Sequence, residues 1–230
     1  GTFPRIYFNN GTQKDKIRSI PNLGNVGWTN FQFAFYGCTE LVEVYGGNTS
    51  GVTNMHAMFH SAEKAEPDTS TWDTSNVTTM VQMFYGAETA NPDVSEWDVS
   101  KVQSMQEMFD EADAAVLGDY TLNWVVSNVT NMAQMFDGAD LANPNTSLWD
   151  TSKVGTMGWM FRNAQSADPD TSSWNVANVS NMGSLFKGSG ISDGNYSTFL
   201  IRTEATSSKN NINIGTVPAG YYTGDAATAR

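Results

Sequence analysis

The methionines of this chain form a ladder with a nearly constant step, and that ladder limits what the chain can fold into. All 11 methionines of the 230 residues fall into two columns, and the columns are three positions apart. The first column is Met55, Met80, Met105, Met132, Met157 and Met182. The second is Met58, Met83, Met108, Met135 and Met160, with Leu185 in the sixth place. Within each column the successive steps are 25, 25, 27, 25 and 25 residues.

Phenylalanine, valine and tryptophan repeat with the same period. A phenylalanine follows each member of the second column, a valine stands three positions before each member of the first, and tryptophans form a further column. These are Phe59, Phe84, Phe109, Phe136, Phe161 and Phe186; Val52, Val77, Val102, Val129, Val154 and Val179; and Trp72, Trp97, Trp124, Trp149 and Trp174. Such a period predicts a solenoid, in which each unit buries its apolar face against its neighbours. It also favours a binding scaffold over an enzyme.

One copy of the repeat indicates the local structures to expect. In residues 91–118, Val102, Met105 and Met108 recur at a spacing that places them on one face of a short helix. Residues 94–99 follow an Asn-Pro-Asp turn and are rich in β-branched and aromatic residues, which predicts a short strand. Glycines stand where the helix should end in other copies, as a C-cap would; these are Gly86, Gly138 and Gly188. The predicted fold class is therefore an α/β solenoid of short parallel strands and short helices.

The copies run without a break, so we expect a single domain over residues 1–230. We assign residues 1–33 to an N-terminal cap, 34–190 to about seven repeats, and 191–230 to a C-terminal cap. One unit, at residues 115–126, carries two extra residues and lacks the proline and both aspartates that recur elsewhere.

The repeat resembles a known family. The pattern Val-x-x-Met-x-x-Met-Phe-x-x-Ala, followed by Asp-x-Ser-x-Trp-Asp-x-Ser, resembles the repeat of the BspA-like leucine-rich-repeat surface proteins of bacteria. Residues 3–10 resemble the segment that precedes such repeats, and residues 196–200 and 211–230 resemble the closing segment. The resemblance implies a leucine-rich-repeat-like solenoid at the bacterial cell surface or outside the cell, often within a longer adhesin. It supplies no catalytic residues.

Charge and cysteine content exclude several classes of partner and site. The formal net charge is −12, and residues 65–150 hold fifteen acidic side chains but one basic side chain, Lys101, which gives −14. Such a field repels phosphate backbones, so we expect neither nucleic acid nor an anionic membrane as a partner. Cys38 is the only cysteine, which excludes an intrachain disulfide. Because alanines occupy its place in other copies, we predict a small buried side chain rather than a nucleophile.

Two histidines are the first candidate metal ligands. His56 and His60 have the i, i+4 spacing that can hold a metal on a helix. No third ligand is evident, and both positions face away from the expected core. We therefore predict two exposed histidines and no zinc site.

Two columns of aspartates are the second candidate. The first contains Asp68, Asp93 and Asp170, and the second contains Asp73, Asp98 and Asp150. Neighbouring strands lie about 5 Å apart, so stacked carboxylates would repel one another unless something relieves the charge. We favour a role in which each aspartate caps its own turn, because asparagine replaces aspartate in both columns. The alternative is Ca²⁺ bridging adjacent rungs through carboxylate oxygens. No other cofactor is expected.

Three residues of the irregular unit are the candidate ligand contacts: Tyr120, Leu122 and Val125. Leu122 aligns with Ser95 and Val125 with Asp98, so these residues can form an exposed apolar spot in an acidic field. A local repacking of the core is the competing interpretation. The repeat also predicts how much stability is lost when two side chains are truncated to alanine. Met108 is expected in the core, where truncation is costly, whereas Asp110 is expected on an outer helix face, where truncation costs little.

Taken with the absence of catalytic motifs, these features predict a non-enzymatic recognition module. We expect adhesion through contact with another protein, within a longer surface protein. The alternatives are a glycan-binding or Ca²⁺-dependent module, and a structural spacer within a larger adhesin.

Overall fold

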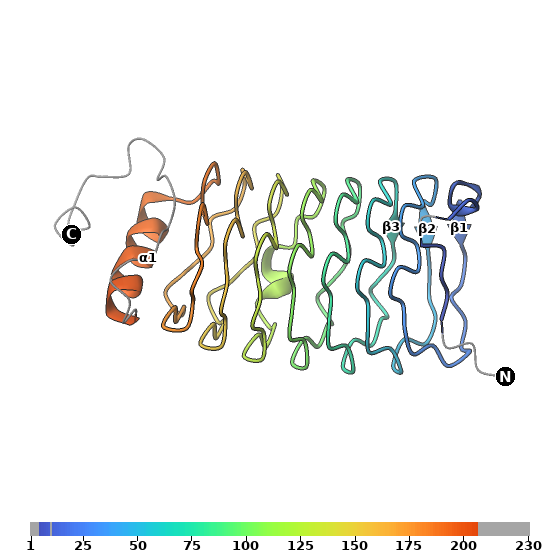
Figure 1. The fold of residues 1–230 in the computed structure, drawn as a ribbon, viewed down its shortest axis with the longest axis horizontal. Helices are drawn as coiled ribbons and strands as arrows, with labels where there is room; N and C mark the ends of the chain where they lie inside the picture. The colour runs from blue at the N-terminus through green and yellow to red at the C-terminus, as the bar shows by residue number, and fades with distance from the viewer. Residues whose placement is uncertain (1–4, 10, 207–230) are drawn as a thin grey trace.

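The computed structural model describes residues 5–9 and 11–206. In Figure 1 the chain winds in coils of similar size that stack side by side along one long axis, from the blue N-terminal end to the orange helix α1. Among the described residues, no helix combines the length and apolar character needed to span a membrane.

Regular secondary structure is sparse. Within the described residues the elements are η1 (Lys14–Lys16), β1 (Ser19–Ile20), β2 (Glu43–Val44), β3 (Glu66–Pro67), η2 (Gly118–Thr121) and α1 (Asp193–Thr206). The strands form one parallel sheet in the order β1-β2-β3. In its register Ser19 pairs with Glu43, and Glu43 pairs with Glu66.

A second ladder of parallel pairing runs along the stack as isolated bridges. The bridges link Arg5, Asn30, Asn54, Thr79, Ser104, Asn131, Thr156 and Asn181 in that order. Each step is one period of the sequence, so equivalent residues of successive copies lie side by side. The sequence repeat is therefore also the repeat of backbone pairing. Membership of the leucine-rich-repeat-like class stays a prediction.

The helices expected within the repeats are absent, and this prediction was wrong. In the copy at residues 91–118, Glu107 and Glu111 have φ of +55° and +56°, and single left-handed residues interrupt a right-handed helix. Every second backbone N–H donates a hydrogen bond to the next coil. The N–H of Glu107, for example, donates to the carbonyl of Ala133 at 2.9 Å. Between them lie single turns, such as Met108 N to Met105 O at 3.2 Å. Pairing with the neighbouring coil has replaced the continuous bonding of a helix.

The strand expected at residues 94–99 is also absent, because parallel pairing falls elsewhere in the copy. Here Trp97 N donates to Val94 O at 3.2 Å, which closes a turn. The bridging residue of this copy is Ser104, inside the segment expected to be helical. The glycines expected at helix ends do adopt the left-handed conformation, with φ of +60°, +69° and +75° at Gly86, Gly138 and Gly188.

The predicted core columns are confirmed. Every valine, methionine, phenylalanine and tryptophan of the columns is buried, none with more than 5% of its surface exposed. The phenylalanines stack between coils, with ring centroids 5.5 Å apart for Phe59 and Phe84 and 5.4 Å for Phe84 and Phe109. Each side chain of this size contributes roughly 1.5–3 kcal/mol through burial, so the columns supply the main stabilisation of the stack.

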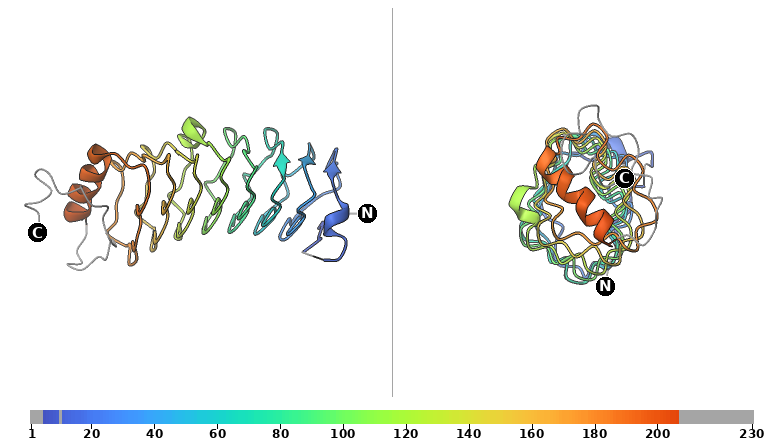
Figure 2. Two further views of the ribbon diagram at one scale, coloured as in Figure 1. Left: turned by 90° about the horizontal axis from the view of Figure 1, so that it is seen from above. Right: turned by 90° about the vertical axis from the view of Figure 1, so that its left-hand side faces the viewer.

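Helix α1 covers the C-terminal end of this core. Phe199 packs against Phe186 with ring centroids 5.1 Å apart and against Trp174 at 6.3 Å, and Tyr196 lies 6.3 Å from Phe186. Figure 2 shows α1 lying across the end of the stack. The C-terminal cap expected from residue 191 stays a prediction. Residues 207–230 of that expected cap, and residues 1–4 and 10 of the N-terminal one, lie outside the described residues.

Candidate interaction surface

Exposed apolar side chains gather around the irregular unit. Ten large hydrophobic side chains are exposed among the described residues, and five of them lie between positions 116 and 148. These five are Val116, Tyr120, Val125, Leu141 and Leu148. Exposed apolar area concentrated in this way is typical of interaction sites.

The two-residue insertion projects from the stack as the short helix η2. Leu117, which precedes η2, and Gly118, its first residue, have φ of +60° and +46°, and they turn the chain outwards. Tyr120 in η2 is 51% exposed, whereas Thr121 is fully buried and its Oγ1 donates to the carbonyl of Asn145 at 3.1 Å. Figure 2 shows η2, in green, standing out from the side of the coils. The insertion is thus absorbed at the surface while the next residue keeps its place in the repeat.

The structure brings Leu122 and Val125 together with Leu148 of the following copy. These side chains line a shallow cavity of about 250 Å³, for which buried Trp124 and Val126 form the floor. We call this the apolar cavity. Val125 is 54% exposed, which confirms that it lies outside the core, and Leu148 is 67% exposed.

Two details of this site differ from the sequence-based selection. Tyr120 does not line the apolar cavity. Leu148 was missed, although a signal was present: its column otherwise contains polar residues, namely Thr71, Glu96, Asn123 and Ser173.

A second cavity is lined in part by the residue that precedes Leu148. It has a volume of about 420 Å³ and is lined by Gly118, Asp119, Asn145, Ser147, Asp168 and Asp170. We call this the acidic cavity. Ser147 lines the acidic cavity and Leu148, the next residue, lines the apolar one, so both open on the same segment of chain.

The aspartate columns make the turn-capping bonds that we favoured. Asp93 Oδ1 accepts from the N–H of Ser95 at 3.0 Å, and hydrogen bonds from the hydroxyl and N–H of Ser95 lower the pKa of Asp93. The same acceptor geometry recurs at Asp68 (3.1 Å), Asp73 (3.0 Å), Asp98 (2.8 Å), Asp150 (3.0 Å) and Asp170 (2.8 Å). Within residues 5–9 and 11–206 no group of three or more His, Cys, Asp or Glu is arranged to hold a metal ion. Bridging by Ca²⁺ stays an untested alternative.

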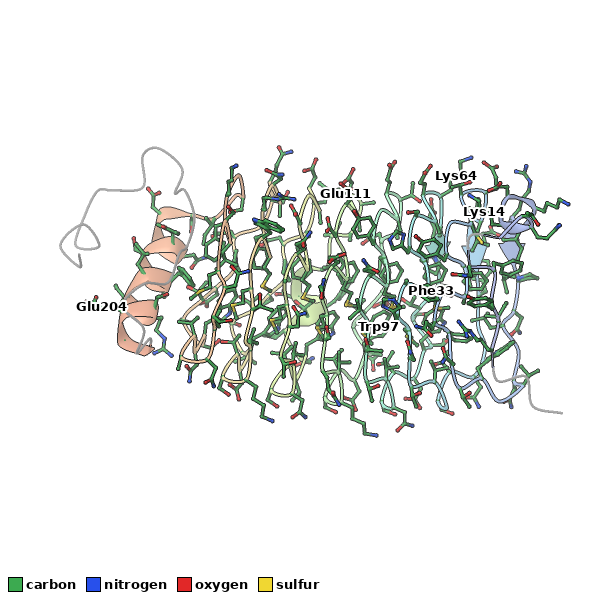
Figure 3. All side chains as sticks on the ribbon, in the orientation of Figure 1. Lys14, Phe33, Lys64, Trp97, Glu111 and Glu204 are labelled. Carbon is green, nitrogen blue, oxygen red and sulfur yellow. The ribbon has the colours of Figure 1, made fainter. Side chains whose placement is uncertain are left out.

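Asp110 is buried, which contradicts its expected place on an outer helix face. Only 4% of its surface is exposed, and Gln134 Nε2 donates to its Oδ2 at 3.3 Å. Burial, followed by the charges of Asp137, Glu111 and Glu107, raises the pKa of Asp110 to about 8. The error follows from the missing helix: without helical geometry, the residue after the core phenylalanine turns towards its neighbours in adjacent coils. Figure 3 shows Glu111, one residue further on, at the outer edge of the coils.

Asp137, in the same column as Asp110, has a cationic partner. It is 2% exposed, and Arg162 Nε donates to its Oδ1 at 2.8 Å, with a second contact between the guanidinium and Oδ2. A charge this deeply buried requires such a partner. Neither Asp110 nor Asp137 lines either cavity.

The two histidines are half-buried rather than exposed. His60 lies between Tyr36 and Tyr85, with ring centroids 4.4 and 4.5 Å away, and the ring centroids of His56 and Phe33 are 5.0 Å apart. Burial lowers the pKa of both imidazoles. Aromatic neighbours in adjacent coils explain the difference, because side chains of successive coils cover one another.

Cys38 is buried as predicted, and burial raises the pKa of its thiol to about 11. A thiol with such a pKa is a poor nucleophile at neutral pH.

Comparison with known proteins gave one family. The family described as "Mycoplasma protein of unknown function, DUF285" matches residues 29–121 and again residues 115–213. The two matches overlap within the irregular unit and together span well over half of the chain. No curated protein and no solved structure matched the chain.

Proposed function

Since this chain belongs to the family described as Mycoplasma protein of unknown function, DUF285, we propose that it is a non-enzymatic recognition module displayed at a bacterial cell surface. In this role it binds another protein. In this proposal the stack of coils is a leucine-rich-repeat-like solenoid related to the BspA-like surface proteins, and the surface around η2 makes the contact.

The observation that carries the proposal is the gathering of exposed apolar side chains at the irregular unit and the copy that follows it. Regular copies place serine and aspartate where this unit has Leu122 and Val125. Such substitutions leave apolar surface in contact with water, and a partner that covers it gains hydrophobic stabilisation. A rim of polar and charged groups around an apolar centre is the usual composition of a protein interface.

The stacked architecture also supports the proposal. Repeat proteins bind through a continuous surface, and one copy that departs from the others distinguishes a single place on that surface. The ladder of bridges keeps equivalent residues in register on both sides of the irregular unit. The insertion therefore changes one place on the surface and leaves the flanking coils regular.

The test is binding of the fluorescently labelled 230-residue chain to intact cultured animal cells. The variant Leu122→Ser/Val125→Asp restores the pattern of the regular copies, so we expect it to fold. Its binding should fall about tenfold or more, equivalent to about 1.4 kcal/mol. The control Ile201→Ser removes an apolar side chain on α1 that is 60% exposed, and it should bind like the parent chain.

Treatment of the cells separates the competing functions. Trypsin treatment should abolish binding, whereas glycosidase treatment or calcium chelation should leave it. Loss of binding after glycosidase or chelation alone would instead favour a glycan-binding or Ca²⁺-dependent module. Absence of binding to all cells would favour a spacer. If Leu122→Ser/Val125→Asp loses stability while binding persists, the two residues are core and the surface has been misidentified.

A further inference from the structure

We infer that the partner presents a basic segment in which an aliphatic side chain lies close to a lysine or arginine. The aliphatic side chain enters the apolar cavity, and the cationic one enters the acidic cavity beside it. This inference rests on the proposed function and specifies the chemistry of the partner.

The apolar cavity is suited to an aliphatic side chain. Its floor is Trp124 and Val126, which are 2% and 1% exposed, and its walls are Leu122, Val125 and Leu148. A leucine or isoleucine that enters it covers apolar surface on both partners. Because the hydrophobic effect is not directional, burial of such a side chain provides an anchor but little specificity.

The acidic cavity supplies the specificity. Its three carboxylates accept hydrogen bonds from neutral donors: Asn145 Nδ2 to Asp119 Oδ1 at 2.8 Å, Ser192 N to Asp168 Oδ1 at 2.8 Å, and Ser172 N to Asp170 Oδ1 at 2.8 Å. The four ion pairs among the described residues involve other carboxylates. These three negative charges are therefore not neutralised by a cation of the described chain.

Further negative charges lie around the two cavities. Asp150 lines the apolar cavity itself, and hydrogen bonds from Ser152, with a smaller contribution from Lys153, lower its pKa. Lys153 Nζ donates to Asn128 at 2.7 Å and forms no ion pair with Asp150 among the described contacts. Residues 65–150 as a whole carry a net charge of −14. Complementary potentials steer association and reject partners of like sign, so a basic segment is favoured and an acidic one is excluded.

One short segment can reach both cavities, because Ser147 lines one and Leu148, the next residue, lines the other. In an extended peptide, side chains two positions apart point to the same side and lie roughly 7 Å apart. A partner with a basic residue two positions from an aliphatic one therefore matches the arrangement.

The test uses a fluorescein-labelled peptide, Ser-Lys-Gly-Leu-Gly-Lys-Ser, acetylated and amidated at its ends, and measures anisotropy with the 230-residue chain. We expect saturable binding that weakens by about tenfold when leucine is replaced by serine, and likewise when both lysines are replaced by glutamate. Raising the salt concentration from about 0.1 M to 1 M should weaken binding severalfold, because screening shortens the reach of the charges to about 3 Å.

Variants of the chain locate the site. Val125→Asp/Leu148→Thr removes the apolar walls with residues that other copies carry at these positions. Asp119→Asn/Asp170→Asn removes two charges, and each amide keeps the oxygen that accepts the local hydrogen bond. Each variant should bind the peptide about tenfold more weakly than the parent chain. The control Asp73→Asn removes a charge from a turn outside both cavities and should leave binding unchanged.

Three results would overturn the inference. They are no binding at millimolar peptide, peptide binding by either cavity variant as tight as by the parent chain, or binding of the serine-substituted peptide as tight as that of the original peptide. These failures are distinct from failure of the proposed function. If the peptide does not bind but Leu122→Ser/Val125→Asp still loses binding to cells, the surface is correct and the chemistry of the partner is wrong. If cell binding is unaffected by that variant, the proposed contact surface is wrong as well.

Discussion

Asp110 should make the chain less stable as pH rises, and replacing it with asparagine should remove that dependence. The carboxyl is 4% exposed, and its pKa is raised from an ordinary value of 3.8 to about 8, with burial as the main cause. At neutral pH the folded chain must hold a proton that the unfolded chain releases. The amide of Asp110→Asn mimics the protonated carboxyl, because it carries no charge and keeps one oxygen acceptor for Gln134.

The sign and size follow from proton linkage. Between pH about 4 and about 8 the folded chain binds one more proton than the unfolded chain, so the free energy of unfolding falls with rising pH. Each unit of pKa difference corresponds to about 1.4 kcal/mol. The stability of Asp110→Asn relative to the parent should thus be near zero at pH 4, rise to about 4 kcal/mol at pH 7, and become constant above pH 8.

The assay is urea unfolding from pH 4 to pH 9, followed by tryptophan fluorescence. Asp73→Asn is the matched control, because hydrogen bonds from Ser75 lower the pKa of Asp73. The pH dependence at Asp73 has the opposite sign. Asp73 stabilises the folded chain at pH values above its unfolded pKa, and this stabilisation is lost as the pH falls through its lower folded pKa. A stability difference for Asp110→Asn that does not change with pH would refute the reasoning, even if the variant were more stable.

Three further predictions concern the core, the backbone and calcium. Met108→Ala should cost about 2–5 kcal/mol by urea unfolding, whereas exposed Gln103→Ala should cost under about 0.5 kcal/mol; equal losses would show that the core columns are misassigned. Glu111→Gly should stabilise the chain by roughly 0.5–1 kcal/mol, because φ is +56° there and Gly86 and Gly138 occupy the same position in other copies. Millimolar calcium should shift the melting temperature no more than sodium at equal ionic strength; a large calcium-specific rise would instead favour carboxylates that share Ca²⁺ between coils.

The sequence by itself determined what is buried along the repeat and where the repeat fails. A column of methionine or phenylalanine at constant spacing can be satisfied only if each copy packs on the next, so the core followed from the period alone. Local chemistry was equally readable, because an Asx turn depends on a side chain and an N–H two residues away, as at Asp93 and Ser95. The exposure of Val125 also followed, since it replaces an aspartate of the regular copies.

Only the tertiary structure decided the backbone conformation between the columns. Residues 102–112 carry a helical spacing, but the alternate N–H groups bond to the next coil, and that pairing exists only once coils are stacked. The burial of Asp110 and His60 follows from the same cause, because each is covered by side chains about 25 residues away in sequence, such as Gln134 and Tyr85. The apolar cavity likewise requires Leu148 from the following copy. Such contacts between copies depend on how far each coil is turned relative to the next, and no local pattern encodes that rotation.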